Sequence, residues 1–290
     1  MASLREIRRR IRSISSTAQI TRAMQMVAAS KMRKAQQATL TTRPFGQLLY
    51  RIQRHATTHA HDFTHPLLAV REIRKRAVIL VGTDKGLCGS LNTNLFRAAA
   101  QFDPETTVYI AVGKRAGQFI ARTRRHLVAE FTVTDSPRFA EARPIAAFAR
   151  DLFLKGEVDQ VLIVATLFIN TMTQQPGTVE FLPIGEIKGF KIRGAEPEGE
   201  LVDNTTDILF EPSPEAVLSY LFGLYLNVYV YRVLLEAKAS EQSARMVAMT
   251  GATDNATALI KDLALEYNKL RQGNITKELL EIAGGQLGNG

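Results

Sequence analysis

Apolar residues near the start of the chain recur with the spacing of a helical seam. The steps between them alternate between three and four residues, which is the repeat of a coiled coil. These positions are Leu4, Ile7, Ile11, Ile14 and Ala18. Ile20, Met24 and Val27 are expected to continue this face after a local shift of register.

One proline interrupts this helical pattern without ending it. Pro44 removes a backbone donor and should kink the helix, but the pattern resumes in "QLLYRIQRHA" (47–56). The sequence therefore predicts one helix from the N-terminus to about residue 58. At 1.5 Å per residue its length is on the order of 85 Å, which exceeds the size of a compact domain.

The middle of the chain has a different pattern, in which short β-branched runs alternate with helical segments. This alternation predicts an open, mostly parallel, Rossmann-like α/β sheet. The expected strands are 76–82, 107–113, 126–133 and 160–168, with two more at 178–184 and 206–212. The expected helices are 91–101, 114–123 and 143–155, and residues 185–205 are expected to form a polar loop or hairpin.

A second long helix is predicted at the C-terminal end. Ser213 is expected to cap it and Pro214 to occupy its first turn, and helical character continues to about Ile282. Two such long helices are not stable alone in water, so we expect them to pair in an antiparallel coiled coil with the α/β domain inserted between them. The expected divisions are an N-terminal helix (1–58), a central α/β domain (76–212) and a C-terminal helix (213–285).

Small residues gather in both predicted helices, where a self-sufficient pair would prefer Leu and Ile. With the nearby methionines they predict a slim rod with a weakly adhesive surface, able to fit inside another structure. These residues are Ala28, Ala29, Ala244, Ala248 and Ala252.

Four segments together resemble one known family along essentially the whole chain, the γ subunit of F-type ATP synthase. The segments are "ITRAMQMVAASKMRKAQ" (20–36), "TDKGLCGSLN" (83–92), "ASEQSARMVAMTGATDNA" (239–256) and "LEYNKLRQGNITKELLEIAGG" (265–285). Gly284 and Gly285 stand where the family often has Gly-Ala. The cysteine-bearing regulatory insertion of chloroplast members is absent, so thiol control of that kind is not expected.

The resemblance implies a mechanical role without bond chemistry, catalytic site or cofactor in this chain. The paired helices would form a central shaft inside a ring of alternating α and β subunits, and a ring of c subunits driven by proton flow would turn that shaft. An ε subunit would bind the globular domain. The resemblance implies contact with the membrane only through the complex, at the cytoplasmic face of a bacterial cell membrane.

The resemblance also implies contact residues. Arg271 and Gln272 match contacts to a β-subunit loop, with Thr276 and Glu278 nearby, and Arg22 and Met24 would lie on the facing helix at the same level. The segment that approaches the c ring is matched by Phe210, Glu211 and Pro212.

The overall charge leaves one alternative open. The net charge is +9, and twelve Lys/Arg but only one acid, Glu6, precede Asp62. A basic arm of this kind could bind nucleic acid. However, its arginines flank an apolar seam and lack interleaved aromatic residues for base stacking, and such an arm would leave the C-terminal helix unexplained.

Other features suggest chemistry only weakly. The "VGTDKGLCGSLN" loop follows a strand, yet it matches neither phosphate-binding glycine motif, so we interpret it as a tight turn with Cys88 packed inside. The single cysteine excludes an internal disulfide. No 18-residue apolar run, secretory signal or defensible acid–base constellation is found.

Histidines gather in one short segment that could, in principle, bind zinc. His55 and His59 would share a helical face, but the spacing provides no third ligand, and a solvated linker is the favoured interpretation. The segment comprises His55, His59, His61 and His65.

Overall fold

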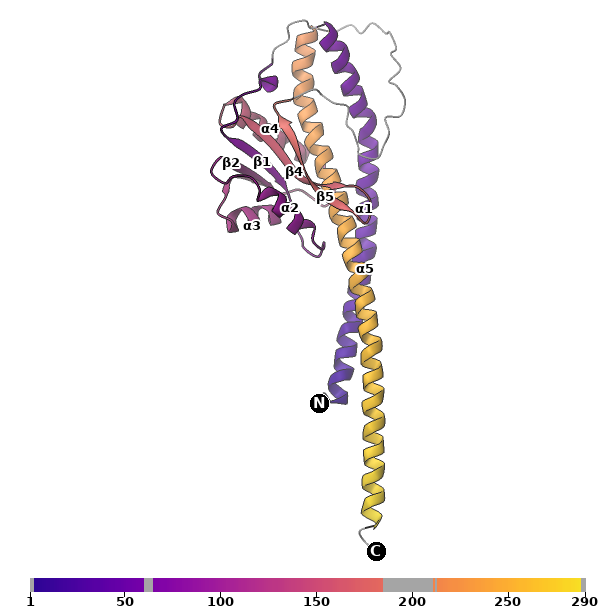
Figure 1. Ribbon diagram of the computed structural model, residues 1–290. Coiled ribbons are helices and arrows are strands. Elements are labelled where there is room, and N and C mark those ends of the chain that lie inside the picture. The colour runs from indigo at the N-terminus through magenta and orange to yellow at the C-terminus, as the bar shows by residue number, and fades with distance from the viewer. Residues whose placement is uncertain (1–2, 60–64, 185–210, 212, 288–290) are drawn as a thin grey trace. The chain divides into compact units, whose positions relative to one another are not determined.

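The computed structural model describes residues 3–59, 65–184, 211 and 213–287, without the side chains of 43–59, 214, 278 and 281–287. In chain order, two long helices, α1 (Leu4–His59) and α5 (Pro214–Leu287), come before and after a five-stranded sheet (Figure 1). Ser3 caps α1 by accepting a hydrogen bond from the Glu6 amide, and Ser213 caps α5 in the same way through Ala216. Both long helices and the predicted Ser213 cap are confirmed.

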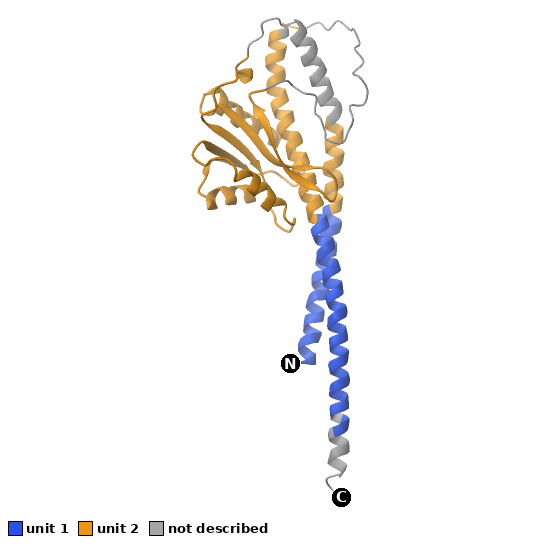
Figure 2. Ribbon diagram, in the orientation of Figure 1, with its two compact units in different colours: residues 1–28, 246–290 blue, residues 29–245 orange. Residues whose placement is uncertain are grey.

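The chain divides into two compact units, and both long helices run through each of them (Figure 2). Unit 1 comprises residues 1–28 and 246–290, and unit 2 comprises residues 29–245. In unit 1 the ends of α1 and α5 lie side by side and antiparallel. The predicted three-part division into 1–58, 76–212 and 213–285 follows the helix ends instead, and as a statement about domains it stays a prediction.

The sheet of unit 2 has the strand order β3-β2-β1-β4-β5. Four strands are parallel, and the last pairs antiparallel with β4. The strands are β1 (Arg76–Val81), β2 (Thr107–Val112), β3 (His126–Phe131), β4 (Gln160–Phe168) and β5 (Gln174–Leu182). The mostly parallel α/β class is confirmed, whereas the strand expected at 206–212 and the loop at 185–205 lie outside the described residues apart from Glu211, which forms a bend.

Helices cover both faces of this sheet because its strands are apolar on both sides. On one face, α2 (Leu91–Ala99) and α3 (Lys114–Arg122) pack on Val78, Leu80 and Tyr109. On the other, α4 (Phe139–Leu154) and the first part of α5 pack on Ile79 and Ile163. A short 3-10 helix, η1 (Pro66–Leu68), adds Leu67 to this second core.

The apolar character of α5 has a structural explanation in this second core. By length and composition alone, residues 215–277 could cross a membrane, with a mean hydropathy of 1.3 in the relevant stretch. Leu226, Val230 and Leu234 of this helix are almost completely buried against the sheet. Packing against the sheet therefore accounts for these three apolar residues, and 39% of the apolar stretch as a whole is buried.

The seam of α1 corrects one prediction. Ile20 and Val27 are more than half exposed, so the expected shift of register does not occur. The original three–four spacing continues instead through half-buried and buried positions, some of them polar. These positions are Thr21, Gln25, Ala28, Met32 and Ala35.

The start of α4 corrects a second prediction. The helix begins at Phe139 rather than at residue 143, although it contains Pro144. The Glu141 carboxylate accepts hydrogen bonds from the backbone amides of Arg138 at 2.7 Å and Thr134 at 3.2 Å, and these bonds lower the pKa of Glu141 against the opposing effect of burial. This cap stabilises the first turn of α4, which lies before Pro144. The position of the proline alone did not predict that the helix begins before it.

We predict that enlarging a small seam residue destabilises the chain. Ala28 is only 1% exposed, so Ala28→Leu should lower the free energy of unfolding by about 1–3 kcal/mol through overpacking. Ala23→Leu, at an exposed position of the same helix, is the matched control and should have little effect. Urea unfolding followed by helical circular dichroism measures both, and equal effects would contradict tight packing at Ala28.

Candidate functional site

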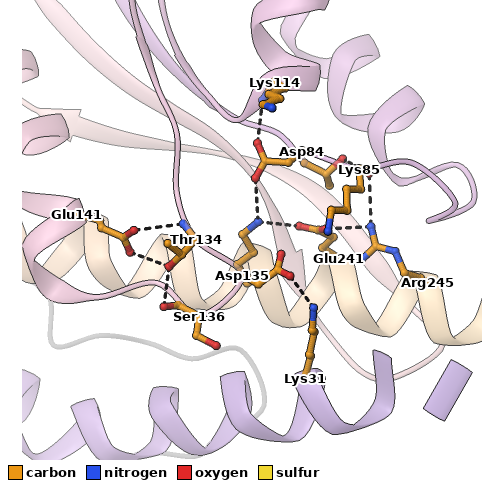
Figure 3. Close-up of polar contacts among 12 residues, drawn as sticks. Lys31, Asp84, Lys85, Lys114, Thr134, Asp135, Ser136, Glu141, Glu241 and Arg245 are labelled. Carbon is orange, nitrogen blue, oxygen red and sulfur yellow. Dashed lines mark hydrogen bonds and ion pairs between the residues drawn. The ribbon is translucent and has the colours of Figure 1, made fainter. Parts of the chain in front are cut away.

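Charged side chains gather where the carboxyl ends of the parallel strands meet α5 in unit 2 (Figure 3). Because parallel strands end at the same edge of a sheet, the loops after β1 and β3 both reach this place. The loop after β1 contributes Asp84, and the loop after β3 contributes Asp135. Lys238, Glu241 and Arg245 come from α5.

Glu241 is the centre of this network. Its carboxylate is 2.9 Å from the Arg245 guanidinium and 3.1 Å from the Lys238 ammonium, and the residue is only 2% exposed. Spacings of three and four residues place all three side chains on one helical face. A buried carboxylate of this kind needs such partners, because an unpaired buried charge is strongly destabilising.

The network ties α5 to the loop that follows β1. Lys238 lies 3.6 Å from the Asp84 carboxylate, and Asp84 in turn accepts a hydrogen bond from the first amide of α3, at Lys114. Arg245 donates to the carbonyl oxygens of Gly86 at 3.1 Å and Lys85 at 3.4 Å. One face of α5 therefore fixes both the conformation and the position of this loop.

A second ion pair ties α1 to the loop after β3. The Lys31 ammonium donates to the Asp135 carboxylate. This hydrogen bond, with the positive charges of Lys31, Lys238 and Lys85, holds the pKa of Asp135 below its usual value despite partial burial. Since both partners are about one third exposed, the pair contributes little to stability on its own.

Glu236 makes a further connection, one turn from this network on α5. Its carboxylate accepts a hydrogen bond from the Phe168 amide at the end of β4, at 3.2 Å. Burial raises the pKa of Glu236, against the opposing effects of that hydrogen bond and of Arg232. The deprotonated form therefore costs folding free energy that the protonated form does not.

The loop after β1 is a tight turn, as the sequence predicted. Leu87 and Gly89 both have positive φ angles, of 63° and 58°. The carbonyls of Lys85 and Gly86 face the Arg245 cation. A phosphate loop would instead direct backbone amides toward its ligand, so this arrangement has the wrong polarity for that role.

Cys88 is packed within this loop rather than presented to solvent. It is 2% exposed and contacts Leu91 and Ala244, and burial raises the pKa of its thiol. A thiol with a raised pKa is a poor nucleophile at neutral pH. Its predicted role as a small packed residue agrees with this geometry.

Only His65 of the histidine segment has a described side chain. Its Nδ1 accepts a hydrogen bond from the Leu67 amide at 3.2 Å, and burial lowers its pKa, so it caps η1 in the neutral form. The side chains of His55, His59 and His61 lie outside the described residues, and the zinc hypothesis for them stays untested. Within the described part of the chain, no three His, Cys, Asp or Glu residues are grouped to hold a metal.

The residues expected to contact a β subunit lie at two levels, not one. Thr21 and Thr253 share a hydrogen bond of 2.7 Å in unit 1, which sets the antiparallel register. Arg22 and Met24 therefore lie beside the Thr253 region, whereas Arg271 is 18 positions further along α5, or about 27 Å. The expectation of a common level is wrong, because this register places Arg271 beside the first residues of α1, near Leu4, and not beside Arg22 or Met24.

Most of the residues expected to contact other subunits are exposed to solvent where their side chains are described. Arg22, Arg271, Gln272 and Thr276 are exposed and Met24 is half-buried. The Thr276 hydroxyl donates to the Gln272 carbonyl within the helix at 3.0 Å, and the Glu278 side chain is not described. Of the residues expected near the c ring, Glu211 is exposed, whereas Phe210 and Pro212 lie outside the described residues.

Comparisons with known proteins identify the family. The family model described as "ATP synthase" matches residues 3–287. The ATP synthase gamma chain of Opitutus terrae is 45% identical over 298 residues, covering 99% of this chain and 98% of that one. This chain belongs to the ATP synthase gamma chain family. The gamma chain of Roseiflexus castenholzii is also 45% identical, with 98% of each chain covered.

A solved structure supports the fold of this gamma-chain family member. A chain from the Euglena gracilis mitochondrial ATP synthase, in an assembly described as OSCP/F1/c-ring, matches with a TM-score of 0.70 and 22% identity, covering 98% of this chain and 93% of that one. A gamma chain is a subunit of the ATPase complex, and the nucleic-acid alternative finds no support in these matches.

Sequence reasoning missed the charge network around Glu241. The signal was present in "EAKASEQSAR" (236–245), where Lys238, Glu241 and Arg245 recur every three to four residues within an apolar helix. Charges on one face of an otherwise apolar helix indicate either solvent or a buried network. Because these side chains are buried against the loop after β1, they form a buried network and not a solvated face.

We predict that Glu241→Gln lowers the free energy of unfolding by about 3 kcal/mol, because Lys238 and Arg245 would remain buried with one anion fewer. Glu105→Gln, at an exposed position, removes the same charge and should change stability by less than about 0.5 kcal/mol. Urea unfolding at neutral pH measures both. A loss no larger than that of the control would show that Glu241 is dispensable.

We predict that Glu236→Gln, unlike Glu241→Gln, raises the free energy of unfolding at neutral pH. Folding raises the pKa of the Glu236 carboxyl group. The protein therefore becomes less stable as the pH rises from the pKa of the group in the unfolded state through its pKa in the folded state. The amide oxygen of the introduced glutamine can still accept from the Phe168 amide. The variant should therefore match the wild type below about pH 4 and exceed it in stability at about pH 7, measured by thermal unfolding across that range. Equal pH profiles would contradict the raised pKa.

Proposed function

We propose that this chain works as the central rotor shaft of an F-type ATP synthase and couples proton flow through the membrane sector to ATP synthesis or hydrolysis at the β subunits. Its relatives are ATP synthase gamma chains, and the match covers 98% and 100% of the length of two of them. In this proposal the chain performs no bond chemistry itself. The helix pair of unit 1 turns inside the ring of α and β subunits, and its asymmetric surface changes the conformation of each β subunit in turn.

The exposed end of α5 is the observation that carries this proposal. Within residues 271–280, every side chain that the structure describes is exposed. Ile275, Leu279 and Leu280 are 48%, 61% and 67% exposed. Apolar side chains gathered in this way on a helix indicate contact with a partner, and the surrounding subunits of the catalytic ring are the proposed partner.

The polar residues of this segment suit contacts that must form and break. Arg271, Gln272 and Thr276 are exposed, and exposed polar or ionic contacts contribute only about 0–1 kcal/mol each. We propose that they meet a β-subunit loop together with Glu278. Arg22 and Met24 would then contact β at a second level, about 27 Å away along α5.

In this proposal unit 2 receives the torque. Phe210, Glu211 and Pro212 would approach the c ring and an ε subunit would bind the α/β domain. The network around Glu241 and the core packing of α5 would hold this helix on the sheet, so that the domain and the helix turn as one body. The complex would sit at the cytoplasmic face of a bacterial cell membrane, which this chain touches only through its partners.

Reconstitution with separately purified α and β subunits tests the proposal. We expect one copy of this chain per α3β3 ring and raised, cooperative MgATP hydrolysis. Deletion of residues 273–290 removes most of the exposed apolar end and should weaken assembly. A chain that elutes apart from α and β, or that binds RNA with a steep salt dependence, would overturn the rotor proposal.

We predict that Arg271→Ala lowers MgATP hydrolysis of the assembled complex by at most about fivefold, the effect of losing one exposed contact of about 1 kcal/mol. Arg122→Ala, at an exposed position on α3, removes the same charge from the α/β domain and should leave hydrolysis unchanged. Steady-state hydrolysis of both assembled variants provides the comparison. Equal activities of the two variants would remove Arg271 from the proposed contact.

A further inference from the structure

A small cavity lies at the point of the sheet where open α/β folds bind their ligands. From β1 the chain crosses to β2 on one side, and β4 pairs with the other side of β1. The strand order therefore reverses between β1 and β4, and in such sheets the crevice outside the carboxyl ends of these strands holds a ligand. Here α5 lies against that crevice and contributes Leu234, Ala237, Lys238 and Glu241 to the lining of the cavity.

The space that α5 leaves is the size of one water molecule. The cavity offers about 10 Å³ to the centre of a water, close to the minimum that holds one. Polar lining comes from β4, from the loop after β1 and from α5. The polar side chains are Thr83, Asp84, Thr166, Lys238 and Glu241.

Thr166 presents a polar atom that needs a partner in this cavity. The residue is 4% exposed, and its hydroxyl Oγ1 has no hydrogen-bond partner among the described residues. Its backbone carbonyl, in contrast, accepts from the Ser240 hydroxyl of α5 at 3.2 Å. A buried hydroxyl without any partner is destabilising, and water fills this role in many folded proteins.

The charges around the cavity favour a neutral occupant. The carboxylates of Asp84 and Glu241 are balanced by Lys238 and Arg245, which lie within ion-pair distance of them. An added cation or anion would disturb that balance. The Lys238 ammonium has three N–H donors, and its contacts with Asp84 and Glu241 use at most two of them.

We propose that this cavity is a binding site for one water molecule, which joins the Thr166 hydroxyl at the end of β4 to the charge network of α5. The water accepts from Lys238 and completes the hydrogen bonding of Thr166. It thereby adds a third link, beside the hydrogen bonds of Ser240 and Glu236, between the end of β4 and the helix that packs on it. The crevice used by nucleotide-binding proteins of this architecture is thus reduced to a single solvent site.

The variant Thr166→Val distinguishes a bound water from an unpaired hydroxyl, because the two cases predict different directions of change in the melting temperature. If the water is present, Val removes its partner, and the melting temperature should fall by about 2–4 °C. If the hydroxyl is unpaired, Val removes an unfavourable polar group, and the melting temperature should stay equal or rise. The second result would overturn the proposal.

Thr107→Val is the matched control. The Thr107 hydroxyl is also without a partner among the described residues and the residue is 1% exposed, but it does not line the cavity. Its replacement should leave the melting temperature equal or higher. Thr166→Ser keeps the hydroxyl and should retain more stability than Thr166→Val.

A crystal structure of the full chain provides a readout that does not depend on stability. We expect one ordered water within hydrogen-bond distance of Thr166 Oγ1 in the wild type and in Thr166→Ser. An empty cavity in the wild type, or an ion in place of water, would overturn the proposal. If Thr166→Val fails to fold, the wild-type and Thr166→Ser structures still decide the question.

Discussion

The structure depends on one helix that must satisfy two kinds of packing along a continuous backbone. Within unit 2, α5 is a core helix whose residues Phe222, Leu226 and Leu234 are buried against the sheet. Within unit 1, the same helix is one member of an antiparallel pair, in register through Thr21 and Thr253. Its sequence therefore has to provide an apolar face for the sheet in one part and a seam for α1 in the other.

Buried charges restrict the position of α5 on the sheet of unit 2 more strongly than apolar packing alone would. Apolar side chains tolerate small shifts between a helix and a sheet, since they can repack. Lys238, Glu241 and Arg245 cannot shift without leaving buried charges unpaired, because each is at most 7% exposed and has a defined partner. The network therefore favours one position of α5 on the loop after β1, which suits a part proposed to carry torque.

The extent of sequence prediction followed the strength of each local signal. The strands β1, β2 and β4 and both long helices have apolar patterns with clear periods, and the sequence located them to within a few residues. The antiparallel pairing was inferred correctly from the two seams, but the relative level of Arg22 and Arg271 was not. Register depends on which residues face each other across the pair, and no periodicity within one helix contains that information.

Polar residues in apolar positions explain most of the other differences. Thr21 and Gln25 continue the seam of α1, and an apolar criterion passed over them in favour of the exposed Ile20 and Val27. The sequence pattern of the charged residues at 238, 241 and 245 fits either a solvated face or a buried network, and the contact of Arg245 with the loop after β1 decides between them. In each case the environment of the side chain comes from residues distant in the sequence.

Direct observation of rotation would test the rotor account most directly. The α3β3 ring would be fixed to a surface and a visible probe attached through Arg122→Cys, an exposed position on α3, while Cys88 stays shielded at 2% exposure. The account predicts stepwise rotation of the probe in one direction upon addition of MgATP. A complex that hydrolyses MgATP at its normal rate while the probe stays still would contradict it.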